Sequence, residues 1–177
     1  MNKNWHGLIK IIEIQHLSKD GEIIWEDHDL YNVLHATGEQ FILSAVFAGG
    51  QTNSVIPSSY YFGLDNRTSL LAADTMSTIA SNNSEPTTNG YVRQAVSSDS
   101  EFVVTQVSNV NRATSPIVTF TATGGSWGPI SNLFLTDALA FGGFLIASVP
   151  LSTALTVSSG ESINMRMALA LRDCPSS

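Results

Sequence analysis

The closing stretch of the chain, residues 120 to 171, constrains the fold more than any other segment. It contains the strand-like runs ISNLFLTD, FLIASVPL and SINMRMALAL, separated by segments rich in Gly and Ser. Short apolar and β-branched runs bounded by turn residues are typical of β-strands. Arg166 and Arg172 are the only basic residues from Phe120 onward. The segment therefore predicts a β-rich structure whose surface carries little charge and suits packing against other protein subunits.

Earlier runs continue this pattern toward the N-terminus, at residues 59–66, 91–98, 101–108 and 116–123. Together they predict about seven strands after residue 50, spaced roughly ten to fifteen residues apart with turn signals between them. Such spacing favours a mainly β fold, an antiparallel β-sandwich or jelly roll. A parallel α/β sheet or a helical bundle would need repeated helix patterns, which the sequence lacks.

A β-hairpin is predicted ahead of the strand series. Residues 7–17 and 22–27 are rich in Ile and broken by polar positions, as in two strands. Asp20–Gly21 lies between them, and Asp-Gly flanked by apolar runs is a strong hairpin signal.

After the hairpin, the spacing of the apolar residues changes. From residue 29 to 50, apolar side chains recur three, four and seven positions apart, which indicates one amphipathic helix. Asp29 is the expected N-cap and Gly49–Gly50 the expected end. Gly38 falls inside this range, where a glycine is expected to bend or split the helix.

These patterns predict a single domain over residues 1–177. The hairpin and helix occupy residues 1–50, and the β-sandwich occupies residues 55–172. A further short helix is expected after Thr68 or Ala73, inside a longer connection between strands.

Composition narrows the classes of function. Charged residues make up 13% of the 177 residues, about half of the usual share of roughly 25%. The net charge is −7, and eight Lys and Arg residues are scattered along the chain, so direct nucleic-acid binding is not expected.

Cys174 is the single cysteine, which excludes an internal disulfide. The N-terminal apolar run is short and interrupted, so we expect no signal peptide, no transmembrane helix and no membrane contact.

One string looks catalytic. Residues 124–128 fit the G-x-S-x-G pattern, which in α/β-hydrolases lifts a serine on a turn between a strand and a helix. Here a strand-like run follows Ser126, and every histidine precedes it, whereas the hydrolase order places the histidine last. We therefore expect no catalytic residues and no enzyme activity.

Metal and cofactor sites are also not expected. His28 and His35 lie seven residues apart, too far for the helical pairs that hold one ion well. Asp65, Asp74 and Asp99 fall in turns without the spacing of a calcium loop. The sequence contains no phosphate loop and no dinucleotide fingerprint.

Aromatic side chains are the candidates for protein interfaces. Trp5, Trp25, Tyr31 and Trp127 are the interface residues we expect, because Trp and Tyr are enriched at binding hot spots. A role in the core is the alternative, above all for Trp25. The consecutive aromatics Tyr60, Tyr61 and Phe62 leave a second alternative open, a sugar-binding platform.

The order of several motifs resembles virion structural proteins of tailed bacteriophages. The motifs are YYFGLDN, ADTMSTIAS, EPTTNGYVRQAV, VTFTATGGSWGPISNLFLTD, GGFLIASVPL and VSSGESINMRMALAL, spread over residues 59 to 171. Proteins of this group have a strand ending in Gly-Leu, an Asp-Thr segment, an Asn-Gly-Tyr-x-Arg-Gln block and a closing pair of strands. The matching positions are Gly63, Leu64, Asp74, Thr75, Asn89, Gly90, Tyr91, Arg93 and Gln94.

The resemblance implies a non-enzymatic structural protein of a phage particle. Capsid decoration or cementing is the first expectation. A tail, fibre or baseplate adaptor is the alternative, and a glycan-binding module for host recognition is another. The implied partners are other virion proteins, foremost the major capsid protein, and copies of the chain itself, with a trimer among the options. The implied location is the virion, after synthesis in the host cytoplasm.

Overall fold

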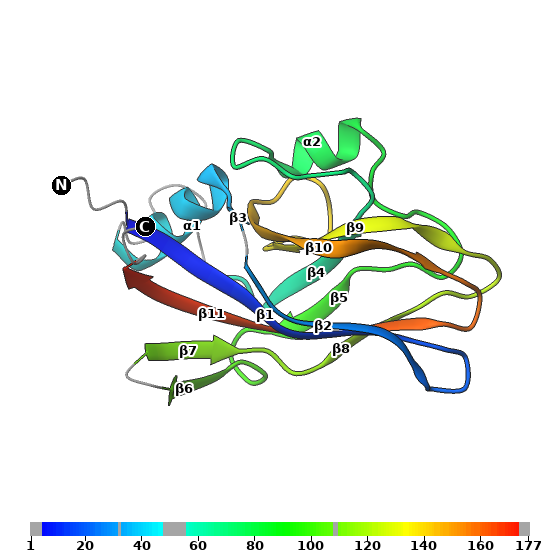
Figure 1. Cartoon of the computed structure of the whole chain (residues 1–177). Coiled ribbons are helices and arrows are strands. Elements are labelled where there is room, and N and C mark those ends of the chain that lie inside the picture. Colours follow the sequence, from blue (N-terminus) through cyan, green and yellow to red (C-terminus); the bar gives the residue numbers. More distant parts are fainter. Residues whose placement is uncertain (1–4, 32, 48–55, 108–109, 174–177) are drawn as a thin grey trace.

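The computed structural model describes residues 5–31, 33–47, 56–107 and 110–173, which form two packed antiparallel sheets (Figure 1). The larger sheet has the order β2 (Ile23–Tyr31), β1 (Trp5–Leu17), β11 (Ser162–Asp173), β7 (Val110–Thr114), β6 (Val103–Val107), and β8 (Val118–Thr121) pairs with β11. The smaller sheet has the order β3 (Val33–Leu34), β10 (Leu145–Val157), β9 (Trp127–Thr136), β4 (Ser59–Asp65), β5 (Gln94–Ser97). The prediction of a mainly β sandwich is confirmed.

The predicted hairpin forms, with β1 and β2 joined through the Asp20–Gly21 turn. Gly21 has φ +84°, in the left-handed region that glycine enters without strain. β1 also pairs with β11 from Trp5↔Asp173 to Leu17↔Ser162. The hairpin is therefore built into the larger sheet, and deleting it would expose the edge of β11. The domain bounds given above stay a prediction.

The prediction of one helix from residue 29 is wrong at its beginning. Helix α1 covers Ala36–Phe47, and the strands β2 and β3 precede it. Leu30 pairs with Ile11 in β1, and Val33–Leu34 pair with β10. Asp29 lies inside β2 with φ 60° and is not a helix N-cap. Pairing with strands distant in sequence overrode the local helical period, as tertiary context often does. The expected end at Gly49–Gly50 lies outside the described residues.

The strand series after α1 is confirmed, with one addition. The described residues contain eight strands there, β4 to β11, and β7 is the strand that was not predicted. Its sequence VNRAT is polar and carries no clear alternation. The short helix is α2, Met76–Ser81, whose N-cap Thr75 and Thr78 form a capping box.

The main core lies between the two sheets, and β9 is buried on both faces. Residues 132–136 of β9 are all buried. On the inner side, Leu133 and Leu135 join the main core. On the outer side, Phe134 packs with Leu70, Met76, Ile79 and Leu145 beneath the α2 segment. A strand covered on both faces has a continuous apolar run, which explains the consecutive residues Leu133, Phe134 and Leu135.

Candidate docking surface

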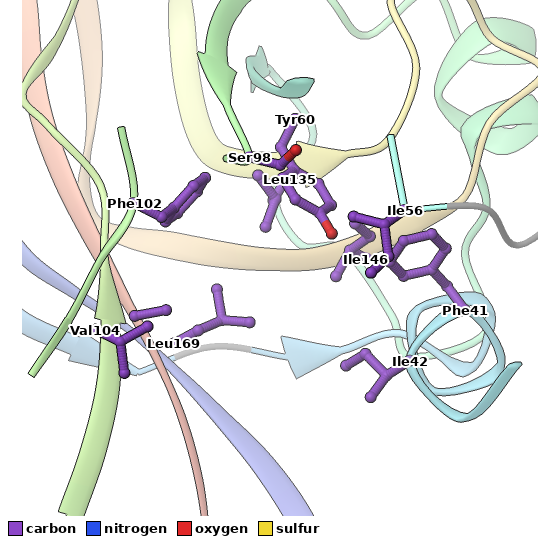
Figure 2. A pocket seen from close by; sticks show the side chains of 11 residues that line it. Phe41, Ile42, Ile56, Tyr60, Ser98, Phe102, Val104, Leu135, Ile146 and Leu169 are labelled. Atoms are coloured by element: carbon purple, nitrogen blue, oxygen red, sulfur yellow. The ribbon is translucent and has the colours of Figure 1, made fainter. Parts of the chain in front are cut away.

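An apolar cleft of about 270 Å³ opens where the two sheets meet α1 (Figure 2). Leu135 and Ile146 come from the smaller sheet, Val104 and Leu169 from the larger sheet, and Phe41 from α1. None of the described side chains that line it is charged. Tyr60 and Ser98 bring hydroxyl groups to this lining, which otherwise suits apolar groups that bind by excluding water.

One wall of the cleft is a chain of aromatic rings. The ring of Tyr60 lies edge-on to Phe41, 6.1 Å between centroids, and edge-on to Phe102 at 5.8 Å. Edge-to-face contacts at these distances stabilise aromatic pairs. Burial, with a smaller contribution from Asp137, raises the pKa of the Tyr60 hydroxyl, which stays neutral at physiological pH. Tyr60 is therefore packed between two other rings and is partly exposed at the cleft, and a sugar-binding platform here stays a prediction.

Further apolar side chains are exposed close to the cleft in sequence. Leu43, Val46 and Phe47 of α1 are exposed, Phe47 to 78%. Ile56, which also lines the cleft, is exposed as well. Large exposed apolar groups in one region are typical of protein interaction sites.

The strand at the edge of the larger sheet adds a second kind of surface. All five residues of β6 are exposed, and among the described strands β6 pairs with β7 alone. An edge strand presents unpaired backbone N–H and C=O groups that can accept another strand. The sequence VVTQV contains no charge and no Pro to prevent this. The strand itself was predicted, but its edge position depends on a sheet order that local patterns do not contain.

Arg93 holds a buried network that fixes the loops on one face. Its guanidinium bonds both carboxylate oxygens of Glu85, at 2.8 and 2.6 Å. It also donates to the carbonyls of residues 138, 139 and 140, and lies over the ring of Phe141 at 4.8 Å. Tyr91 donates to Glu85 at 2.6 Å, and burial raises its pKa well above the usual value. The Asn-Gly-Tyr-x-Arg-Gln block thus has a structural role.

Asp65 anchors a second buried network. It accepts hydrogen bonds from Ser84 and from Asn132, the latter at 3.2 Å, and pairs with Arg67 at 3.3 Å. Arg67 also reaches Asp74 at 3.5 Å. These contacts bind the segment that carries α2 to the smaller sheet. Within the described residues, no group of three or more potential metal ligands gathers.

Ser126 does not have the geometry of a hydrolase nucleophile. It is exposed in the connection between β8 and β9, and the chain continues into a strand where the hydrolase motif requires a helix. His35 is buried against Ser148, 2.9 Å between Nε2 and Oγ, and His16 contacts Glu161 at 2.9 Å. His28 lies exposed on β2.

Of the four aromatic residues predicted to lie at an interface, the structure describes the side chains of Trp25 and Trp127. Trp127 is only 4% exposed, and its indole N–H donates to the carbonyls of Thr88 and Asn89 at 3.1 Å. Trp25 is partly buried against the core. Trp5 begins β1 and Tyr31 ends β2, and their side chains lie outside the described part. Neither Trp25 nor Trp127 lines the cleft, and an interface role for the four residues stays a prediction.

His35 predicts a pH dependence of stability. Burial lowers the pKa of its imidazole below the usual value of about 6.5, despite opposing contributions from Asp74 and nearby backbone carbonyls. The unfolded chain therefore binds more protons than the folded chain as the pH falls below about 6.5, and folding stability falls with it. In denaturant titrations between about pH 7 and 5, wild type should lose more stability than His35→Gln. Equal pH slopes for the two proteins would contradict this assignment.

The chain is a mainly β sandwich. The described polar networks of Arg93 and Asp65 hold segments of the fold together, and the exposed surfaces at the cleft and at β6 are uncharged. Within the described residues, no helix is long and apolar enough to cross a membrane. The family model described as podophage GP4 fiber I protein gp80 matches residues 34–169, more than half of the chain, and the chain belongs to this family. It is therefore a tailed-phage virion structural protein, as the resemblance implied. The family is not a known enzyme family. No curated protein and no solved structure matches the chain.

Proposed function

We propose that this chain is a non-enzymatic subunit of a fibre on a podophage particle, held in place by protein–protein contacts. The observation that carries the proposal is the family match over residues 34–169, whose description names a fibre protein. The uncharged cleft and the exposed edge strand β6 support it as surfaces for protein contacts. Arg93 and Asp65 form buried ion pairs that stabilise the fold.

Capsid decoration through the major capsid protein is the second candidate. A protein that binds a repeating shell needs surfaces that bury apolar groups without charge, and the cleft has this character. The same surfaces suit a fibre, so they do not separate the two candidates. The family description favours the fibre.

The proposed partners are other virion proteins and further copies of the chain, as a homo-oligomer. A trimer at a three-fold position on a particle stays the alternative to the dimer proposed below. The net charge of −7 opposes direct contact with nucleic acid. A glycan-binding role has less support, because Tyr60 and Trp127 are packed into the fold.

Locating the chain in purified particles tests the proposal. An epitope inserted at the exposed Asp20–Gly21 turn should leave the sheets intact, because the turn lies beyond the last paired residues of the hairpin, Leu17 and Ile23. We expect immunogold label on fibres. Label spread evenly over the head would favour decoration, and particles that lack the chain would contradict both candidates. An untagged phage serves as the control for background label.

A further inference from the structure

Among the described strands of the larger sheet, β2, β6 and β8 each pair with a single neighbour, and β2 and β6, at the two ends of the main strand order, differ strongly in charge. At one end, β2 carries Glu26, Asp27 and Asp29. At the other end, β6 has the uncharged sequence VVTQV, with Val103 and Val104 exposed to 58% and 71%. Charges on an edge discourage pairing with another sheet, and uncharged β-branched residues allow it. Of these two edges, only β6 is open to a second strand.

The sequence of β6 is complementary to itself. In an antiparallel pair centred on Thr105, Val103 of one copy lies opposite Val107 of the other, and the two Thr105 residues lie opposite each other. Pairs of β-branched residues and Thr–Thr pairs each stabilise neighbouring antiparallel strands. On the other side of the strand, Val104 meets Gln106 of the second copy, beside the cleft that Val104 lines.

The charges around β6 are compatible with this arrangement. Each copy carries a net charge of −7, and a contact strand without acidic residues avoids local repulsion between the copies. Asp99 and Glu101 precede β6, and antiparallel pairing places those of the two copies at opposite ends of the contact. Arg112 of β7 lies opposite Thr105 within each copy. The two Arg112 residues would then be three strand spacings apart, roughly 14 Å, beyond the screening length in physiological salt.

From these observations we propose that β6 pairs antiparallel with β6 of a second copy, around a two-fold axis at Thr105, and joins the larger sheets of two subunits. The contact is isologous, since the same strand serves both sides, and its product is a dimer. It deepens the proposed function, on which it rests in part, by naming the surface through which copies meet. Because the test uses the purified chain, a failure to dimerise is distinct from absence from fibres.

The purified 177-residue chain should be a dimer by light scattering at micromolar concentration. Thr105→Lys places two like charges directly opposite each other and next to Arg112, and should raise the dimer dissociation constant at least about tenfold. Mixing Thr105→Lys with Thr105→Glu should restore a mixed dimer, because opposite charges then face each other. Ile24→Lys, at an exposed position on β2, is the matched control and should leave the dimer unchanged.

A second measurement does not depend on how these variants fold. Thr105→Cys in a Cys174→Ser background should form an intermolecular disulfide under mild oxidation, because opposed strand positions have Cα atoms about 4.5–5.5 Å apart. Ile24→Cys in the same background should stay unlinked. A monomeric or trimeric wild type, a dimer that tolerates Thr105→Lys, or equal crosslinking at both positions would overturn the proposal.

Discussion

Replacing Arg93 with Met should lower the free energy of unfolding by about 3–5 kcal/mol, the usual cost of removing one partner of a buried ion pair. The side chains of Arg93 and Glu85 are only 4% and 6% exposed. Methionine keeps most of the aliphatic stem but leaves the Glu85 carboxylate buried without its cation. It also removes the donor that serves three backbone carbonyls of residues 138–140. Denaturant unfolding followed by tryptophan fluorescence measures the effect.

Two further variants separate the network from the general loss of a charge. Lys19→Met removes an exposed cation in the hairpin turn and should change stability by no more than about 0.5 kcal/mol. In a double-mutant cycle, Arg93→Met combined with Glu85→Gln should cost clearly less than the sum of the single changes, since both break one pair. Additive costs, or a loss below about 1 kcal/mol for Arg93→Met, would show that the pair does not hold the loops.

Local patterns predict most strands of this fold but not their neighbours. The Asp20–Gly21 turn and the apolar runs of β9, β10 and β11 are short-range signals, and each is found where it was expected. The order of the strands depends on pairing between distant segments, such as β1 with β11. That order decides which strand lies at an edge, so the importance of β6 could not be predicted from its own residues.

The helix and the buried polar residues illustrate the same limit. The apolar residues Leu30, Val33 and Leu34 follow a helical period, but Leu30 pairs with β1 and Val33–Leu34 pair with β10, so these residues adopt the extended form. The Asn-Gly-Tyr-x-Arg-Gln block correctly indicates the class of protein, yet nothing near it in sequence predicts that Arg93 binds the carbonyls of residues 138–140. β7 was missed because its polar sequence is stabilised as a strand by β6 and β11.

Gly38→Ala should destabilise the protein by about 1–3 kcal/mol or more, the cost of overpacking a close contact. Gly38 lies in the first turn of α1, where the helix rests on β10. A Cβ atom there would lie 2.1 Å from the carbonyl oxygen of Ile146, and that backbone cannot move without disturbing β10. Helix propensity alone predicts the opposite sign, a gain of up to about 1 kcal/mol for alanine over glycine. The sign of the change, measured by denaturant unfolding, therefore distinguishes packing from propensity.

Gly142→Ala is the matched control, because no atom lies within 4 Å of the added methyl group. It should change stability by no more than about 0.5 kcal/mol. Phe41 and Ile42 line the cleft from α1, so a shift of the helix in Gly38→Ala should also change the fluorescence of an apolar dye bound there. If Gly38→Ala were instead stabilising and left dye binding unchanged, α1 would not rest directly on β10. The cleft would then lack the fixed wall that a docking site requires.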